Sequence, residues 1–246
     1  MNSTPPAIPI LPVPLVYRVP NLAESLAGDN VTKIVVLGSS STAGEGNIVP
    51  YPHRLELGLR DSYSKRDGRP YHMIDVLNRG IGGEEAPKER DRLQDVLKEA
   101  PCLVIWQIGT NSVWQSAADD PPPLEETIKQ LRSGIEQLKE ARTIDIILMD
   151  LQYTPALLTP ATLAATNKMV LAIADVAQSM QVNLFQRFKL MKGWCDLARI
   201  PLDQMVDAGD GSRLHQSEWA TQQISEKLHD VICDAVKREA AEFGRT

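Results

Sequence analysis

The sequence predicts an α/β fold built around one parallel β-sheet. Five short apolar runs lie between residues 34 and 185, and they are continuous rather than alternating. Such runs are typical of strands that other elements cover on both faces. Segments with apolar residues at helical spacing separate the runs. Because strand and helix patterns alternate along the chain, we expect parallel strands joined by right-handed helical crossovers.

The five apolar runs predict the sheet. Each has the length of a short buried strand. Five such strands in alternation with helices favour the flavodoxin-like strand order 2-1-3-4-5. The expected architecture is therefore a flavodoxin-like three-layer α/β/α sandwich around a five-stranded parallel sheet. In chain order, the predicted strands are Ile34–Leu37, Met73–Leu77, Leu103–Ile108, Ile144–Met149 and Val182–Phe185.

Three strong helices are predicted where apolar residues recur every three or four positions. The clearest stripe runs from Leu124 to Leu138, and the prolines at 121–123 set its start. The other two stripes lie at Met169–Met180 and Ile224–Ala235. Ser217 is the expected N-cap of the last helix, because a serine hydroxyl can accept a hydrogen bond from a free backbone amide of the first turn.

A weaker helical stripe lies between the second and third strands. It passes through Ala86, Leu93, Val96 and Leu97. Charged residues gather at its start, and such a run is most simply a solvated helix face. This interpretation covers Glu84, Glu85, Lys88 and Glu89.

The N-terminal segment differs from the rest of the chain. Six prolines lie in its first twenty residues, which predicts an extended arm over residues 1–30 that lies across the domain or across a partner subunit. Residues 31–246 contain no internal repeat and no linker, so we expect them to form a single domain. The oligomeric state is left open.

Composition excludes several function classes. The net charge is −6 and no basic face stands out, which argues against nucleic-acid binding. No apolar run approaches the length of a membrane span. The three cysteines are far apart, so we expect no disulfide framework, and Cys102 and Cys233 are interpreted as small core residues. The N-terminus lacks the basic region of a signal peptide, which favours the cytoplasm, with a targeting segment outside this sequence left open.

Polar residues follow the first three predicted strands. In open α/β sheets, sites lie beyond the carboxyl ends of the strands. In the order 2-1-3, the turn GSSSTAG after the first strand is flanked by NRGIGGEE after the second and GTNSVW after the third. A serine hydroxyl surrounded by backbone amides and an asparagine amide suits acyl transfer, since the serine can attack while the amides hold the oxyanion.

A serine nucleophile needs a base, and His215 is the best candidate. It lies in the polar loop DAGDGSRLHQSEWA, just before the last predicted helix. Asp207 and Asp210 in the same loop are candidates to orient its imidazole. The other histidines suit the role less well. His72 opens a predicted strand at the end away from the site, His229 lies in the last predicted helix, and His53 starts a helix after the serine turn.

At these residues the chain resembles the GDSL or SGNH hydrolase superfamily of esterases, lipases and acylhydrolases. Four blocks carry the resemblance, in the order VVLGSSSTAG, NRGIGG, IGTNS and LHQS. It implies Ser40 as nucleophile, Gly83 and Asn111 as oxyanion donors beside the Ser40 amide, and His215 as base. It also implies the flavodoxin-like fold already expected and a reaction without metal or organic cofactor. No G-x-S-x-G elbow occurs, which argues against the α/β-hydrolase fold.

Two positions depart from that family pattern. Ser39 stands where the family usually has an aspartate that mainly supports the turn. The family's acid usually lies three residues before the histidine, where this chain has Ser212. If the loop is an Asp-Gly-Leu-His motif with two residues inserted, Asp210 orients His215, with Asp207 the next candidate. If neither acid reaches the ring, a backbone carbonyl or water orients it and the site is nearer a dyad.

The sequence therefore predicts a serine esterase for small-molecule or carbohydrate esters. The absence of a long apolar lid favours short acyl groups. Trp114 and Trp219 either line a substrate pocket or pack in the core. Each block also has a structural explanation: a turn of small residues for the serines, a turn that needs positive φ for GIGG, a helix cap for Asn111 and a solvated loop residue for His215. The alternatives are a non-catalytic flavodoxin-like protein whose serine turn binds phosphate or carbohydrate, and an inactive relative of the esterases.

Overall fold

The structure is a computed structural model that describes residues 12–65, 71–114 and 124–243. A five-stranded parallel sheet forms its centre, and the strand order β2-β1-β3-β4-β5 confirms the predicted order. All five predicted strands are present, with ends that differ by up to three residues. The strands are β1 (Thr32–Gly38), β2 (Ile74–Gly80), β3 (Leu103–Gln107), β4 (Asp145–Met149) and β5 (Asn183–Phe185).

Helices follow each strand, as the apolar stripes predicted. The three strong stripes are α7 (Leu124–Glu140), α8 (Leu163–Ser179) and α11 (Glu218–Phe243), whereas the weak stripe forms two short helices, α4 (Ala86–Asp91) and α5 (Leu93–Lys98). Ser217 Oγ accepts a hydrogen bond from the Ala220 amide at 3.1 Å, as an N-cap does. The prolines at 121–123 lie outside the described residues. The other helices are α1 (Pro20–Ala27), α2 (Ser40–Ala43), α3 (Tyr51–Tyr63), α6 (Thr110–Trp114), the 3₁₀ helix η2 (Pro155–Leu157), α9 (Arg187–Asp196) and α10 (Leu202–Met205).

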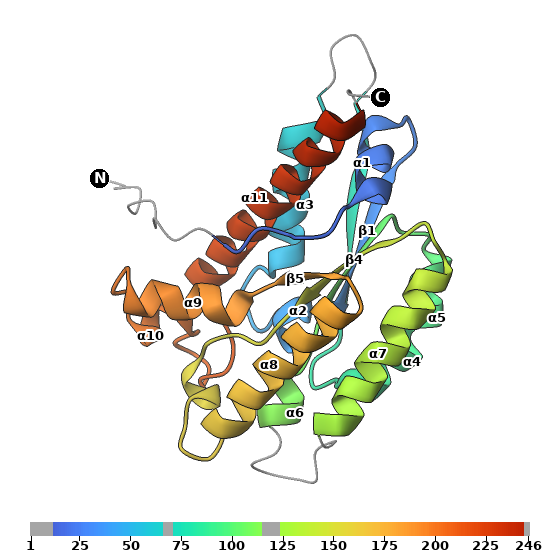
Figure 1. Ribbon diagram of the computed structural model, residues 1–246. Coiled ribbons are helices and arrows are strands. Elements are labelled where there is room, and N and C mark those ends of the chain that lie inside the picture. The colour runs from blue at the N-terminus through green and yellow to red at the C-terminus, as the bar shows by residue number, and fades with distance from the viewer. Residues whose placement is uncertain (1–11, 66–70, 115–123, 244–246) are drawn as a thin grey trace, which may run out of the picture.

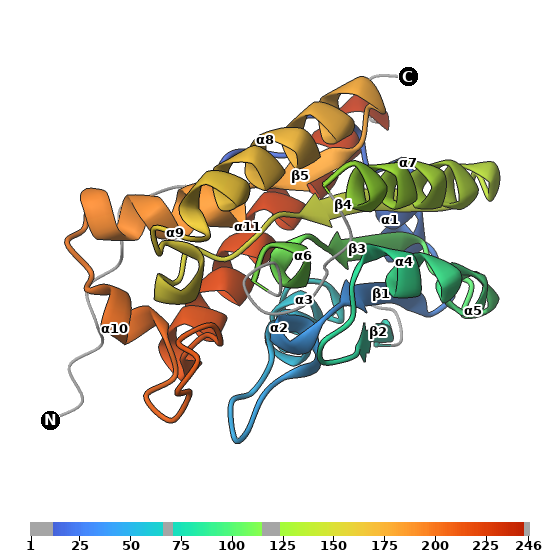
Figure 2. The ribbon, with the colours of Figure 1, turned by 90° about the horizontal axis from the view of Figure 1, so that it is seen from below.

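Two apolar cores cover the two faces of the sheet. Successive side chains of a strand point to opposite faces. In β1, Ile34 and Val36 therefore pack with α1, α3 and α11, whereas Val35 and Leu37 pack with α4, α7 and α8. Figure 1 shows α3 and α11 on one side of the strands and α4 and α7 on the other, and Figure 2 shows the same layers from below. This is the predicted three-layer α/β/α architecture.

The glycine-rich end of β2 fits closely against the serine turn. Gly80 pairs with Gly38 at the ends of the two strands. A Cβ atom on Gly80 would lie 2.3 Å from the Ala43 nitrogen, so only glycine allows this approach. Gly80 therefore lets the end of β2 lie directly against α2, where the site was predicted.

Glu89 corrects the interpretation of the charged run as a solvated face. Its side chain is buried, and it accepts a hydrogen bond from Trp106 Nε1 at 2.9 Å. Burial raises the pKa of Glu89 to about 8, against the opposing effect of that hydrogen bond. The partner comes from β3, so the local charge pattern of α4 gave no sign of it. Lys88 is exposed, and Glu84 and Glu85 are half-buried.

The N-terminal segment is extended only in part. Residues 12–19 lie across the domain, where the Tyr17 amide donates to Asn183 Oδ1 at 2.8 Å. Residues 20–27, which the prediction placed in the arm, form α1 instead. Pro20 is compatible with a helix because it occupies the first turn. Asp145 accepts a hydrogen bond from the Leu22 amide at 2.8 Å, which fixes the start of α1 on the sheet. Residues 1–11 lie outside the described part of the chain.

Helix α11 is the longest of the helices described. None of the helices in the described part of the chain combines the length and the apolar composition that a bilayer span requires.

Candidate active site

The serine turn forms the centre of the candidate site. Ser40 is the first residue of α2. A single residue, Ser39, separates it from the end of β1 and has an extended conformation. Gly44 ends the short helix with φ of +96°, a conformation that glycine adopts readily. Ser40 is 7% exposed and lines a small hollow at the carboxyl end of the central strand. This is the position at which α/β sheets place their sites.

Gln107, at the end of β3, holds the serine turn. Its side chain is 1% exposed, and Oε1 accepts hydrogen bonds from the Ser39 amide and hydroxyl, both at 3.2 Å. The same oxygen accepts from Ser41 Oγ at 3.4 Å and from Thr42 Oγ1 at 3.2 Å. Ser39 stands where an aspartate was expected to support the turn, and here the support comes from the neighbouring strand. Sequence analysis missed Gln107 because it lay within a predicted buried strand.

A buried chain of hydrogen bonds joins Gln107 to the loop that carries the candidate base. Gln107 Nε2 donates to Thr110 Oγ1 at 3.4 Å, and Thr110 donates to Gln152 Oε1 at 2.8 Å. Gln152 Nε2 then donates to the Leu214 carbonyl at 3.4 Å, one residue before the candidate base. Arg187, which is fully buried, also donates to Gln152 Oε1, at 2.9 Å. The serine turn and the histidine loop thus share one polar support.

His215 meets Ser40 across the site. Its Nε2 lies 3.1 Å from Ser40 Oγ, although the two residues are 175 positions apart in the chain. The loop is fixed by a bridge between Val206 and Gln216 and by a hydrogen bond from the Asp207 amide to the His215 carbonyl at 3.0 Å. A serine hydroxyl within hydrogen-bond distance of an imidazole is the arrangement that activates a nucleophile.

Asp210 lies on the other side of the His215 ring. Its Oδ2 is 3.1 Å from Nδ1 of His215 and accepts the backbone amide of that residue at 2.7 Å. Burial raises the pKa of Asp210, but hydrogen bonds from the Ser212 hydroxyl and from nearby backbone amides outweigh it and hold the pKa at about 2. The carboxylate is therefore ionised at neutral pH. Of the two candidate acids, the structure brings Asp210 to the ring, whereas Asp207 accepts the Gly209 amide at 3.0 Å.

The two predicted oxyanion donors lie on helix α6 and on the loop between β2 and α4. Asn111 is 4% exposed in α6, and its Nδ2 donates to the Glu84 carbonyl at 2.8 Å. Gly83, which precedes Glu84, has a φ of +76°. A Cβ on the adjacent Gly82 would lie 3.9 Å from Ser40 Cβ, which places this turn beside the serine. Asn111 follows the first residue of α6, so it is not the cap of that helix.

The model of the non-GDSL lipase-like family matches residues 11–238. The chain belongs to this family. It is therefore a hydrolase of ester bonds, and the predicted resemblance to the GDSL and SGNH hydrolases is confirmed. Among curated proteins, none matches the sequence at a significant level.

Solved structures share the fold of this lipase-like protein. The lipase/acylhydrolase from Enterococcus faecalis superposes with a TM-score of 0.63 at 20% identity, over 82% of this chain and 95% of that one. The acetylxylan esterase Axe2 from Geobacillus stearothermophilus superposes with a TM-score of 0.61 at 19% identity, over 83% of this chain and 94% of that one. At these identities the likeness shows the fold alone.

A further acid lies beside the base of the lipase-like site. Glu45 follows the serine turn directly, and its Oε1 lies 3.7 Å from His215 Nε2. The carboxylate is 45% exposed at the mouth of the site. Sequence analysis did not single out Glu45, although its place next to GSSSTAG was a signal that could have found it.

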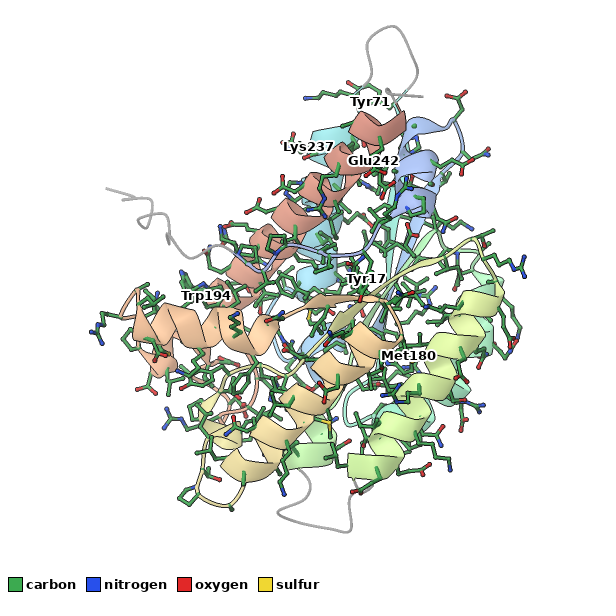
Figure 3. All side chains as sticks on the ribbon, viewed as in Figure 1. Tyr17, Tyr71, Met180, Trp194, Lys237 and Glu242 are labelled. Carbon is green, nitrogen blue, oxygen red and sulfur yellow. The ribbon has the colours of Figure 1, made fainter. Side chains whose placement is uncertain are left out.

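A small hollow opens beside Ser40, and the predicted pocket tryptophans do not line it. Trp219 packs edge-on against Trp194 of α9, with ring centroids 5.4 Å apart, and Figure 3 labels Trp194. Trp114 is half-buried against the core on the α7 face. Both placements agree with the alternative that these tryptophans pack in the core and do not line the substrate pocket. The residues that line the hollow are Ser40, Ser41, Gly44, Glu45, Ile48, Pro50, His215, Gln216 and Thr221.

Within the described ranges, no three or more His, Cys, Asp or Glu side chains are grouped as metal ligands would be. The expectation of a reaction without a cofactor stays a prediction.

Proposed function

We propose that this protein hydrolyses carboxylic esters through Ser40, His215 and Asp210. The observation that carries the proposal is the continuous line from Ser40 Oγ to His215 Nε2 and from His215 Nδ1 to Asp210, with both distances at 3.1 Å. The Asp210 carboxylate favours the tautomer with a proton on Nδ1, which leaves Nε2 free to accept the Ser40 proton. Asp210 also stabilises the imidazolium that results.

Acylation begins when Ser40 Oγ attacks the carbonyl carbon of the ester. His215 takes the hydroxyl proton, and a tetrahedral intermediate forms. The oxyanion is held by the Ser40 and Gly83 backbone amides and by the Asn111 carboxamide. Because a carboxamide nitrogen carries two hydrogens, Asn111 can hold the Glu84 carbonyl and still donate to the oxyanion. His215 then gives its proton to the leaving alcohol, and the ester C–O bond breaks.

Deacylation repeats these steps with water. His215 removes a proton from a water molecule, which attacks the acyl carbon of the Ser40 ester. The second tetrahedral intermediate uses the same oxyanion donors. His215 returns its proton to Ser40 Oγ as the acid leaves, so that the free enzyme is restored.

The proposed substrates are short acyl esters of small molecules or carbohydrates. The small hollow beside Ser40 supports a short acyl group. The similarity to Axe2, which is named as an acetylxylan esterase, supports acetylated carbohydrates as the first compounds to test. A panel of acyl lengths, with acetylated xylan fragments included, tests both points. Preference for a long-chain ester would contradict the short-acyl proposal.

Substitution of the nucleophile tests the mechanism. We expect Ser40→Ala to abolish hydrolysis of p-nitrophenyl acetate and labelling by a fluorophosphonate probe, because only an activated serine reacts with the probe. Ser41→Ala is the matched control, since Ser41 belongs to the same turn and bonds Gln107 rather than His215. It should keep most of the activity. An unlabelled wild-type protein would instead favour the binding-protein alternative or an inactive relative.

A further inference from the structure

A second cluster of reactive side chains lies between α3 and α11, away from Ser40. Cys233 Sγ is 3.3 Å from Nε2 of His229. Ser62 Oγ, from α3, lies 2.9 Å from the same nitrogen. Because Cys233 and His229 are four residues apart on α11, the helix itself places the thiol and the imidazole on one face. Gly58 of α3 leaves room for the ring, since a Cβ there would lie 3.2 Å from His229 Cδ2.

This cluster borders a cavity of about 650 Å³. Cys233, His229 and Tyr63 line the cavity, and Pro12 and Pro14 of the N-terminal segment form another part of its wall. Cys233 is 7% exposed, so its thiol is shielded from bulk solvent but borders a space that admits a small molecule. Lys237, which Figure 3 labels on α11, also lines the cavity.

Two helices supply the polar and charged groups around the thiol. From α11 these are His229, Asp230, Asp234 and Lys237, and from α3 they are Ser62 and Tyr63. Burial raises the pKa of Cys233, but hydrogen bonds with His229 and with the Tyr63 and Ser62 hydroxyls outweigh it, so the pKa lies below its usual value. The hydrogen bond with Cys233 raises the pKa of His229, against the effect of burial.

The other two cysteines provide an internal contrast. Burial raises the pKa of Cys102 to about 11. Burial also raises the pKa of Cys195, and the negative charge of Asp196 adds to this. Cys102 donates its thiol hydrogen to the Lys33 carbonyl at 3.3 Å. Neither Cys102 nor Cys195 lines the cavity beside Cys233. Both are half-buried, so on exposure alone they would react at least as readily as Cys233.

We propose that Cys233 and His229 form a thiolate–imidazolium pair, and that Cys233 is the site at which small electrophiles and hydroperoxides modify this protein. With an alkyl iodide, the thiolate sulfur forms a C–S bond and iodide leaves. With a hydroperoxide, the thiolate attacks one peroxide oxygen, the O–O bond breaks, and the sulfur becomes a sulfenic acid. The other oxygen leaves as alkoxide or hydroxide and takes the imidazolium proton from His229. The sulfur is oxidised by two electrons and the peroxide is reduced by two.

Alkylation rates measured at each cysteine test the proposal. The wild-type protein is treated with limiting iodoacetamide at pH 7, and each cysteine peptide is quantified by mass spectrometry over time. Rates in guanidinium, where the protein is unfolded, give the reference. We expect Cys233 to react at least about tenfold faster than Cys102 and Cys195 in the folded protein, and the three to react equally when unfolded. A folded-state rate for Cys195 equal to or above that of Cys233 would overturn the proposal.

Two variants test the part that His229 plays. In His229→Gln, we expect the Cys233 rate to fall by about tenfold or more, because the imidazolium is lost. His53→Gln, on exposed His53 of α3, is the control and should leave the rate unchanged. Ser62→Ala is a smaller change in the same cluster and should give an intermediate rate even if His229→Gln folds poorly. An unchanged Cys233 rate in both cluster variants would show that the pair does not exist.

Hydrogen peroxide with dimedone tests the second reaction. We expect dimedone adducts at Cys233 in wild-type protein and in Ser40→Ala alike, since this cluster does not depend on the proposed esterase site. Adducts mainly at Cys195 or Cys102, or none at Cys233, would contradict the proposal.

Discussion

At the residue scale, hydrogen-bond partners distinguish hydroxyls that look alike in the sequence. Ser39, Ser41 and Thr42 all donate to the Gln107 carboxamide oxygen. Ser40 points the other way, to His215. A side chain whose hydroxyl is held by a structural acceptor is a poor nucleophile, because its proton and its position are already committed. The turn thus presents one hydroxyl to the candidate base and uses three for support.

The choice between the two acids of the histidine loop gives the first prediction. We expect Asp210→Asn to lower kcat/KM for p-nitrophenyl acetate by about 100-fold or more, since an amide no longer favours the Nδ1-protonated tautomer or stabilises the imidazolium. Asp207→Asn should change it by less than about threefold, because Asp207 bonds the Gly209 amide rather than the ring. If Asp207→Asn were the more damaging variant, Asp210 would not be the orienting acid.

The hydrogen bonds of Ser212 bear on the interpretation of Ser212 and Arg213 as an insertion between Asp210 and His215, which stays a prediction. The expected spacing of acid and histidine put Ser212 at the acid's place. In the structure, the Ser212 amide and hydroxyl both donate to Asp210 Oδ1, at 2.9 and 2.6 Å. Ser212 therefore occupies Oδ1, while Oδ2 accepts the Leu214 and His215 amides and lies beside the His215 ring. Such a closed loop depends on local backbone geometry that residue spacing alone does not specify.

At the scale of elements, the carboxyl ends of β1, β2 and β3 assemble the site. Continuous apolar runs predicted these strands and their order, because burial on both faces leaves a clear pattern in the chain. The cross-strand support by Gln107 left no such pattern. Its partners lie 65 to 68 residues earlier, and a single glutamine at the end of an apolar run has many explanations.

Replacement of Gln107 tests this cross-strand support. Gln107→Met keeps the shape but removes the acceptor of the buried Ser39 amide and hydroxyl, whereas Thr42 keeps its hydrogen bond with the Tyr51 hydroxyl. Each such loss costs about 1–3 kcal/mol, so we expect a lower free energy of unfolding in urea. We also expect kcat to fall by at least about tenfold with little change in KM, because Ser40 loses its exact position. An unchanged kcat in a folded variant would show that the turn holds itself.

Glu89 gives a prediction on pH. Its pKa is near 8 in the folded protein, against an ordinary value of 4.5. Between these values the folded chain binds more protons at this residue than the unfolded chain does, so its contribution to stability falls as pH rises. The slope for one group is at most about 1.4 kcal/mol per pH unit. Glu89→Gln removes this dependence and should gain stability relative to wild type from pH 5 to pH 8 in urea unfolding. A difference between the two proteins that stays constant with pH would mean that Glu89 titrates normally.

At the scale of the whole molecule, long-range contacts join the N-terminal segment to the last helix. The proline content predicted an extended arm, and residues 12–19 fit that prediction. The sequence did not reveal where the segment lies, because its hydrogen-bond partners Asn183 and Glu239 are 166 to 221 residues away. Glu239 of α11 is 3% exposed and accepts hydrogen bonds from Arg18 and from the Val19 amide, the latter at 3.0 Å. The beginning and the end of the described chain are thus joined by a buried carboxylate and by a hydrogen bond from Arg238 to the Leu15 carbonyl.

A matched pair of glutamates tests how far this contact stabilises the fold. Arg18 also lies 3.3 Å from Glu242, which is 59% exposed and is labelled with Tyr17 in Figure 3. We expect Glu239→Ala to lower the free energy of unfolding by about 1–3 kcal/mol, because the Val19 amide loses its acceptor in a buried place. Glu242→Ala should change it by no more than about 0.5 kcal/mol, as exposed ion pairs contribute little. Both changes introduce the same helix-favouring alanine into α11, so helix propensity cancels in the comparison. Equal effects of the two substitutions would mean that other contacts, such as the hydrogen bond from Arg238 to the Leu15 carbonyl, hold the N-terminal segment in place of Glu239.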